Sequence, residues 1–143
     1  MSTETPLSGN AKRKLKSAAR FYAVQALYQM EVSGQTTDSI IREFLDHRFA
    51  AVYEDMEFVD GDVDLFTSLV KDAVNYQAKI DQMTDRALVA KWPIERIDPT
   101  LRALFRAAGA ELVKAKTPPK VVIVEFVHVA EAFFPDGKEP RFV

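Results

Sequence analysis

Five positive side chains near the start of the sequence have the clearest capacity for binding chemistry. They are Lys12, Arg13, Lys14, Lys16 and Arg20. Residues 11–30 hold no acidic residue to offset them. On a helix, Lys12, Lys16 and Arg20 recur every four residues and therefore line one side. Such a row suits the phosphates of a nucleic acid, because each contact releases condensed counterions. An ordinary solvated helix face is the alternative interpretation, and the spacing by itself does not separate the two.

Other residues suited to catalysis or metal binding are few. The sequence has no cysteine, and its two histidines, His47 and His128, are far apart in the sequence, so no metal-ligand spacing is recognisable. No phosphate-binding glycine loop and no helical His-Glu-x-x-His motif occurs. The six acids within residues 53–64 lack the spacing of a calcium loop and indicate a solvated loop. We therefore expect a protein that is not an enzyme and that uses neither a metal nor a cofactor.

The overall composition is that of a small globular protein. The chain has 143 residues, 48% of them hydrophobic, and a net charge of −2, which fits one domain. Residues 1–10 are polar and predict a flexible tail, followed by a single domain over residues 11–143. The lack of cysteine is typical of a reducing compartment, and no apolar run reaches the length of a membrane span. These features predict a cytoplasmic protein without a membrane segment.

Helical periodicity dominates the pattern that must position the basic residues. Apolar residues recur at steps of three and four over residues 11–32, 38–52, 63–91 and 98–116, as on the buried faces of helices. Gly34 ends the first helix, Thr37 is a candidate cap of the second, and the weak rhythm over residues 75–79 predicts a break in the third. The inner face of the helix over residues 98–116 is predicted to hold Leu101, Leu104, Phe105, Ala108 and Leu112.

The last apolar segment has two readings. The β-branched run over residues 121–124 favours a strand by local propensity. Glu125, His128 and Glu131 recur every three residues, as a polar line on a helix would. We predict a helix here. With it the chain is expected to be all-α, a bundle of six to seven helices in two three-helix subdomains.

Several short segments together resemble the NusB family. Residues 20–28 read RFYAVQALY, residues 92–97 WPIERI, residues 104–106 LFR, residues 111–112 EL, residues 119–125 PKVVIVE and residues 141–143 RFV. The resemblance implies an all-helical fold of two subdomains, no cofactor and no catalytic step. It also implies a transcription antitermination factor that binds the boxA segment of nascent ribosomal RNA. In this role it would act with a small-subunit ribosomal protein (NusE) on RNA polymerase.

The same resemblance implies which residues form the site. The RNA-binding residues would be Lys12, Arg13, Lys16, Arg20, Arg141 and Phe142. The residues that meet the ribosomal protein would be Tyr28 and Glu95. Purely structural roles are the alternative for several of them. Tyr28 could be a half-buried residue, Phe142 a packing residue, and Arg20 the partner of an acid on a neighbouring helix.

Three departures from the family pattern bear on these roles. The family usually continues after Phe-Val with Asn-Gly-Val-Leu, whereas this sequence ends at Val143. Val124 stands where the family prefers Asn, and Leu101 where an acidic residue is common. The last departure concerns a contact with the partner protein.

Two other functions remain open from the sequence. One is the helical RNA-binding region of an RNA cytosine methyltransferase, which shares the fold but needs a cofactor-binding domain and a catalytic cysteine. The other is a protein-interaction adaptor that binds no RNA. A homodimer is one possible assembly.

Overall fold

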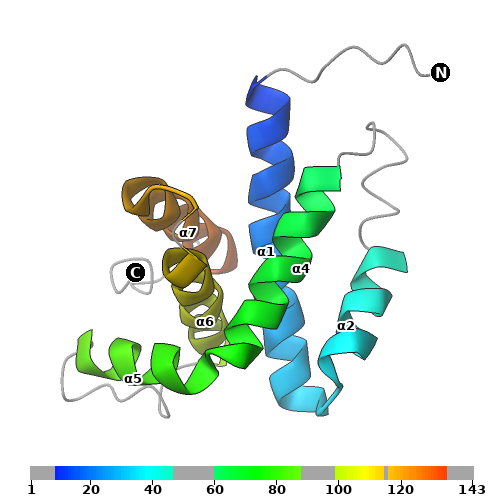
Figure 1. Cartoon of the computed structure of the whole chain (residues 1–143), viewed down its shortest axis with the longest axis vertical. Coiled ribbons are helices and arrows are strands. Elements are labelled where there is room, and N and C mark those ends of the chain that lie inside the picture. Colours follow the sequence, from blue (N-terminus) through cyan, green and yellow to red (C-terminus); the bar gives the residue numbers. More distant parts are fainter. Residues whose placement is uncertain (1–8, 47–59, 88–98, 115, 135–143) are drawn as a thin grey trace.

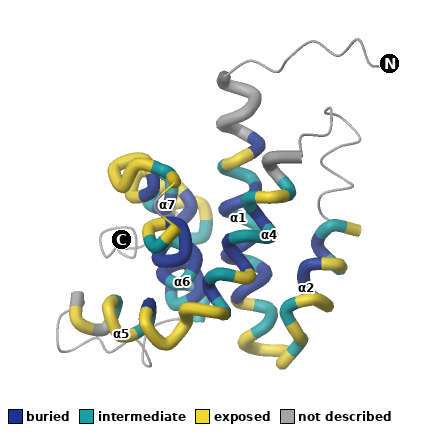
Figure 2. The backbone as a smooth tube through the Cα atoms, viewed as in Figure 1, coloured by how far each residue is buried: buried dark blue, intermediate teal, exposed yellow. Residues whose placement is uncertain are grey.

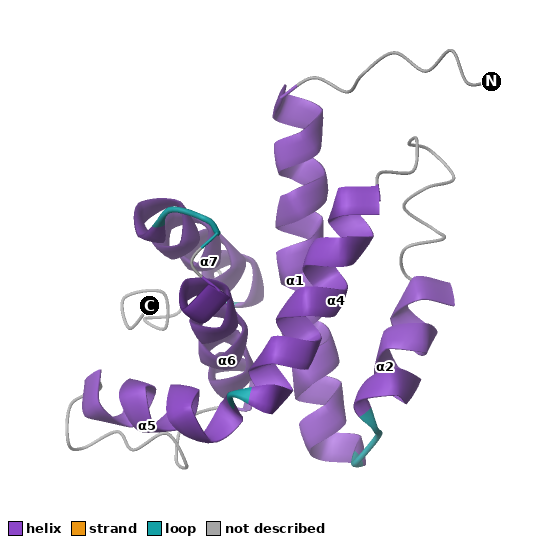
Figure 3. Cartoon of the chain, viewed as in Figure 1, coloured by secondary structure: helices purple, strands orange, loops and turns teal. Residues whose placement is uncertain are grey.

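The computed structural model describes residues 9–46, 60–87, 99–114 and 116–134, and this part of the chain contains helices but no strand (Figures 1 and 3). The helices are α1 (Gly9–Ser33), α2 (Thr37–Phe44), α4 (Asp60–Asn75), α5 (Gln77–Ala87), α6 (Pro99–Lys114) and α7 (Pro119–Phe133). The all-α prediction is therefore confirmed. In Figure 1, α1, α2 and α4 lie to one side and α5, α6 and α7 to the other, which matches two sets of three helices.

The ends of the first helices follow local chemistry. Gly34 has a φ of 75°, a left-handed conformation that suits glycine after a helix, and its N–H donates to the Met30 carbonyl at 2.9 Å. The cap of α2 is Thr36, and the prediction of Thr37 was wrong by one residue. Thr36 has extended backbone and its hydroxyl accepts a hydrogen bond from the Ser39 N–H, whereas Thr37 is already helical.

The long helical pattern in the middle of the sequence breaks where its apolar rhythm weakens. Tyr76 separates α4 from α5, as predicted for residues 75–79. The predicted extension of the second helix to residue 52 and the acidic loop lie partly or wholly outside the described residues. So do most of the predicted tail, residues 1–8, and the predicted first residue of α6, Asp98. Gly9 and Asn10 belong to α1.

The ambiguous last segment is a helix. Pro119 occupies the first turn of α7, where its missing N–H leaves no hydrogen bond unmade. Val122, Phe126, Val129 and Ala130 are buried, at the spacing of one helix face. Val121, Ile123 and Val124 are exposed. The burial pattern thus follows a helical period and overrides the strand propensity of the β-branched run.

Helix α1 lies at the centre of the packing and contacts α2, α4, α6 and α7. Ala19, Ala23 and Ala26 on it are fully buried (Figure 2), and these small side chains let neighbouring helices approach closely. Phe44 of α2 stacks on Phe66 of α4 with ring centroids 5.7 Å apart. Buried apolar residues of all six described helices form a single cluster, so one apolar core joins the two sets of helices.

The crossing of α5 and α6 also needs a small residue. Gly109 of α6 is buried, and a Cβ atom added there would collide with the side chain of Ile80 on α5. Ile80 is itself 1% exposed, so it has little room to move. No helix in the described part of the chain is long and apolar enough to span a membrane.

Candidate nucleic-acid interface

The basic stripe of α1 is divided between solvent and the core. Lys12 and Arg13 lie in the first turns of α1, but their side chains fall outside the described residues. Lys16 is exposed. Arg20, one turn further on, is only 4% exposed. The expected continuous row of solvent-facing cations is therefore wrong at Arg20, because α6 and α7 pack over α1 at this level.

Arg20 is held by two carboxylates from other helices. Its Nε and Nη2 atoms each donate to Glu111 of α6 at 2.8 Å, which makes a bidentate pair. Its Nη1 atom donates to Oε1 of Glu125 on α7 at 3.2 Å, and the Ser17 hydroxyl donates to the same oxygen at 2.6 Å. This arrangement matches the structural role weighed for Arg20 from the sequence. Its predicted contact with RNA is not tested by this arrangement.

The charge state of Arg20 follows from this environment. Burial by itself lowers the pKa of Arg20, because it disfavours the charged form. The hydrogen bonds and negative charge of Glu111, joined by those of Glu125, outweigh burial and raise the pKa above its ordinary value. The guanidinium is thus permanently charged and joins α1 to α6 and α7.

Glu111 was not predicted from the sequence, although a signal for it was present. Glu111 lies seven residues after Leu104 and three after Ala108, so it falls on the apolar face of α6. It is 3% exposed, whereas Leu112, predicted to face inward, is 41% exposed. The inner face of α6 is therefore offset from the predicted one near its end. A carboxylate on an apolar face indicates a buried positive partner.

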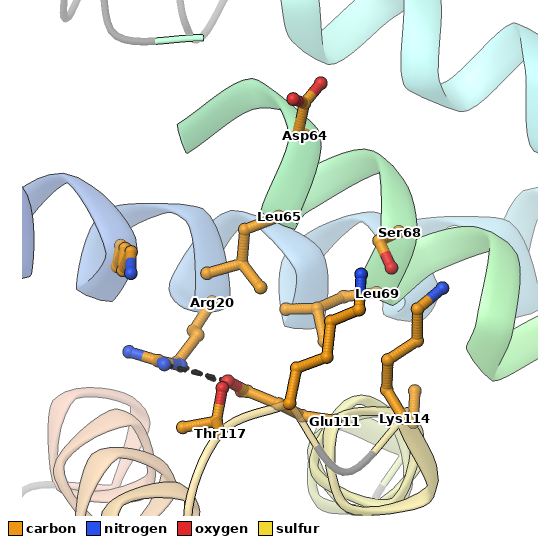
Figure 4. A pocket seen from close by; sticks show the side chains of 11 residues that line it. Arg20, Asp64, Leu65, Ser68, Leu69, Glu111, Lys114 and Thr117 are labelled. Carbon is orange, nitrogen blue, oxygen red and sulfur yellow. Dashed lines mark hydrogen bonds and ion pairs between the residues drawn. The ribbon is translucent and has the colours of Figure 1, made fainter. Parts of the chain in front are cut away.

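Beside Arg20, side chains of α1, α4, α6 and the segment before α7 enclose a hollow of about 460 Å³ (Figure 4). Three lysines line it: Lys16 of α1, Lys114 of α6 and Lys116. The distance of about 100 residues between Lys16 and the other two hid this grouping from a reading of the sequence. The structure therefore adds two cations to the basic end of α1 that were not predicted.

Tyr28 lies on a different surface. It is 39% exposed and lines a hollow of about 390 Å³ together with Gln25, Gln29, Thr100 and Phe133. Phe133 of α7 also stacks on Phe21 of α1, with ring centroids 4.7 Å apart and planes inclined by 12°. This surface thus presents aromatic and amide groups, a composition suited to contact with another protein.

The remaining predicted site residues, Glu95, Arg141 and Phe142, lie outside the described residues. Of the two histidines, His128 is exposed and His47 is outside the described part. No group of three or more potential metal ligands occurs among the residues that the structure describes. Leu101, one of the departures from the family pattern, is fully buried. In this chain that position therefore serves the core.

Known proteins resemble this chain over nearly its whole length. The model of the NusB family matches residues 17–143. A transcription antitermination protein NusB from Maricaulis maris is 48% identical over 99% of this chain and 88% of its own length. The corresponding protein from Caulobacter vibrioides is 45% identical over 96% of this chain and 91% of its own length.

A solved structure shares the fold. A crystal structure of the antitermination factors NusB and NusE in complex with dsRNA contains a chain that matches with a TM-score of 0.73 and 22% sequence identity. The match covers 90% of this chain and 89% of that one. The relatives are transcription antitermination proteins, which confirms the prediction of a non-enzymatic family. The extent of the family match and the identities of 45–48% show that this chain belongs to the NusB family.

Proposed function

We propose that this chain is a cytoplasmic antitermination factor that binds boxA-type single-stranded RNA of the ribosomal leader. It acts together with a small-subunit ribosomal protein in its NusE role, on elongating RNA polymerase. The observation that carries the proposal is the basic, acid-free first half of α1, whose Lys16 is exposed. A related fold occurs in a complex with NusE and RNA, which supports the same assignment.

Different surfaces serve the two partners in this proposal. RNA phosphates bind Lys16 and, before it on α1, Lys12 and Arg13. Arg141 and Phe142 extend this contact. The ribosomal protein meets the surface around Tyr28, with Glu95 as a further contact. Tyr28 suits this role because a partly exposed aromatic ring offers contact area at a small cost in conformational entropy.

Fluorescence anisotropy with a boxA-like strand and a scrambled strand, each with and without the ribosomal protein, tests this function. The chain by itself is expected to bind RNA modestly, because its net charge is −2 and its cations are confined to one region. The ribosomal protein is expected to raise the affinity about 5- to 150-fold, the usual range of coupling between two ligands. An adaptor that binds no RNA would show no saturable change at physiological salt, and that result would overturn the proposal.

The contribution of Lys16 has its own test. Lys16→Gln is expected to lower the slope of log affinity against log salt by roughly 0.7, the value for one phosphate contact on a single strand. The affinity of this variant for the boxA-like strand and for the scrambled strand should fall equally, because phosphate contacts carry no sequence information. Lys79→Gln is the matched control, since Lys79 is exposed on α5 and lies outside the hollow beside Arg20. Equal slopes for both variants would remove Lys16 from the interface.

A further inference from the structure

We propose that the hollow between α1, α4 and α6 takes one nucleotide of the bound RNA, and that Lys114 and Lys116 are further phosphate-binding residues. This inference rests on the proposed function and adds a second, defined region of contact with the RNA. It brings into the site two lysines that are distant from α1 in the sequence.

The size and walls of the hollow fit a nucleotide. Its volume of about 460 Å³ lies within the range of small-molecule sites. Leu65 and Leu69 of α4 and Ala110 of α6 form an apolar wall, against which a base or ribose can pack. Ser68 and Thr117 add hydroxyl groups to the lining. The combination of an apolar wall with a few polar groups is what nucleotide recognition requires.

The charge of the hollow comes from its lysines. Arg20 and Glu111 also line it, but they neutralise one another in their bidentate pair. Lys16 and Lys116 are exposed and form no ion pair with any residue that the structure describes. Lys114 extends from α6 toward α4 (Figure 4) and pairs with Asp72 at 3.2 Å. Its side chain is 44% exposed, so water already weakens this pair and a phosphate can compete for the ammonium group.

Besides Glu111, which is paired with Arg20, one acidic side chain lines the hollow and opposes an anion. Asp64 of α4 lines the hollow and is exposed. Lys16 and Lys116, which form no ion pair with a described residue, outnumber Asp64 in the lining of the hollow, while Lys114 is paired with Asp72. Asp64 therefore provides a test of opposite sign, since its neutralisation should strengthen binding of a phosphate.

The position of Lys16 favours RNA as the occupant. Lys16 belongs both to the acid-free stretch of α1 and to the lining of the hollow. Lys16 therefore connects the positive residues of α1 to the hollow. Successive phosphates of a strand along this path are bound by Lys16 and then by Lys114 and Lys116.

The experiment measures RNA affinity across a salt series for the full chain. The double variant Lys114→Gln/Lys116→Gln is expected to lower the salt slope by about 1.4, roughly 0.7 for each lost contact. The control is Lys71→Gln/Lys79→Gln, which removes two exposed lysines that do not line the hollow. Asp64→Asn is expected to raise affinity at low salt. A melting curve for each variant verifies that the compared proteins are folded.

The possible outcomes separate this inference from the proposed function. If the unaltered chain binds no RNA, the proposed function fails and this inference fails with it. If the chain binds RNA and Lys16→Gln lowers the slope, but the hollow variant behaves like its control, the inference is overturned while the function stands. The site would be established by two results together. The salt slope falls for Lys114→Gln/Lys116→Gln but not for its control, and the RNA affinity rises for Asp64→Asn.

Discussion

Two ionic clusters lie along α1, about three helical turns apart, and they differ in how far water reaches them. The inner cluster is Arg20 with Glu111 and Glu125, and the outer cluster is Glu31 with Arg102, Arg106 and Asp81. The Arg20 and Glu111 side chains are 5% and 4% exposed. In the outer cluster the side chains are 14–28% exposed.

The local bonding in the two clusters is nearly the same. Arg102 donates to both oxygens of Glu31 at 2.7 and 3.0 Å, and Arg106 to both oxygens of Asp81 at 2.9 and 2.8 Å. Each pair thus has the bidentate geometry of Arg20 and Glu111. Removing one partner of a buried pair leaves an uncompensated charge and costs about 3–5 kcal/mol. Exposed pairs contribute about 0.2–1 kcal/mol. We therefore expect burial, and not hydrogen-bond geometry, to set the stability that each cluster contributes, with the partly buried outer pairs closer to the value for exposed pairs.

The largest expected effect is at the centre of the inner cluster. Arg20→Ala should lower the free energy of unfolding by about 3–5 kcal/mol, because Glu111 is then left buried without its cation. Urea unfolding at neutral pH measures this loss. On the folded fraction, the salt slope for RNA should equal that of the unaltered chain. A reduced salt slope with unchanged stability would show that Arg20 binds RNA. It would contradict the assignment of Arg20 to a buried ionic cluster.

The next effect distinguishes the two acids of the inner cluster. Glu125→Gln should cost about 1.5 kcal/mol, the lower end for a hydrogen bond to a charged group, because the Glu125 side chain is 20% exposed and Arg20 keeps Glu111. Glu111→Gln serves as the reference and should cost more. Thermal melting of both variants is the measurement. Equal losses would mean that burial does not rank the members of the cluster.

A smaller effect is expected in the outer cluster. Arg102→Ala should lower the free energy of unfolding by less than about 1 kcal/mol at low salt. This loss of unfolding free energy should become smaller as salt is added, because salt screens the ion pairs and the Debye length falls to about 3 Å at 1 M. Urea unfolding at low and high salt measures both quantities. A loss as large as that of Arg20→Ala would show that the outer pairs are effectively buried.

The smallest effect is the pH dependence of the outer cluster. The hydrogen bond from Arg102 lowers the pKa of Glu31 more than burial raises it, and the charges of Arg102 and Arg106 add to the lowering. The stability from Glu31 is therefore complete above its unfolded-state pKa of about 4.3. It is lost as the pH falls through the lowered pKa of the folded state.

Unfolding of the unaltered chain and of Arg102→Ala between pH 7 and pH 3 measures this dependence. The difference in free energy of unfolding between the two proteins should decrease as the pH falls. Arg20 gives no comparable signal, because its raised pKa lies above any pH used here. A difference that stays constant down to the lowest pH would exclude Glu31 as the titrating group.

Much of the fold was predictable because helices follow from local patterns. The positive φ of Gly34, the break at Tyr76 and the proline at the start of α7 all depend on residues adjacent in sequence. The all-α class followed from the helical periodicity of the apolar residues. The one-residue error at the cap of α2 arose because Thr36 and Thr37 have the same capping chemistry.

The candidate site was less predictable, because its parts come from distant segments. The basic character of α1 is a property of residues 11–30 and was visible in the sequence. That Lys16 faces solvent while Arg20 faces Glu111 depends on how α6 and α7 pack on α1. Four residues on a helix turn through about 40° more than one full circle, which is enough to move a side chain from the surface into a packed interface.

The sequence by itself therefore determined the helical class, the end of α1 at Gly34 and the sign of the charge on α1, since these depend on neighbours within a few turns. Tertiary structure alone decided which cations are available to a ligand. It buried Arg20 against two acids and brought Lys114 and Lys116 beside Lys16. The physical reason is that the accessibility of a charge depends on the helices packed around it. Contacts between distant segments leave only weak signals in the local sequence pattern, such as the glutamate on the apolar face of α6.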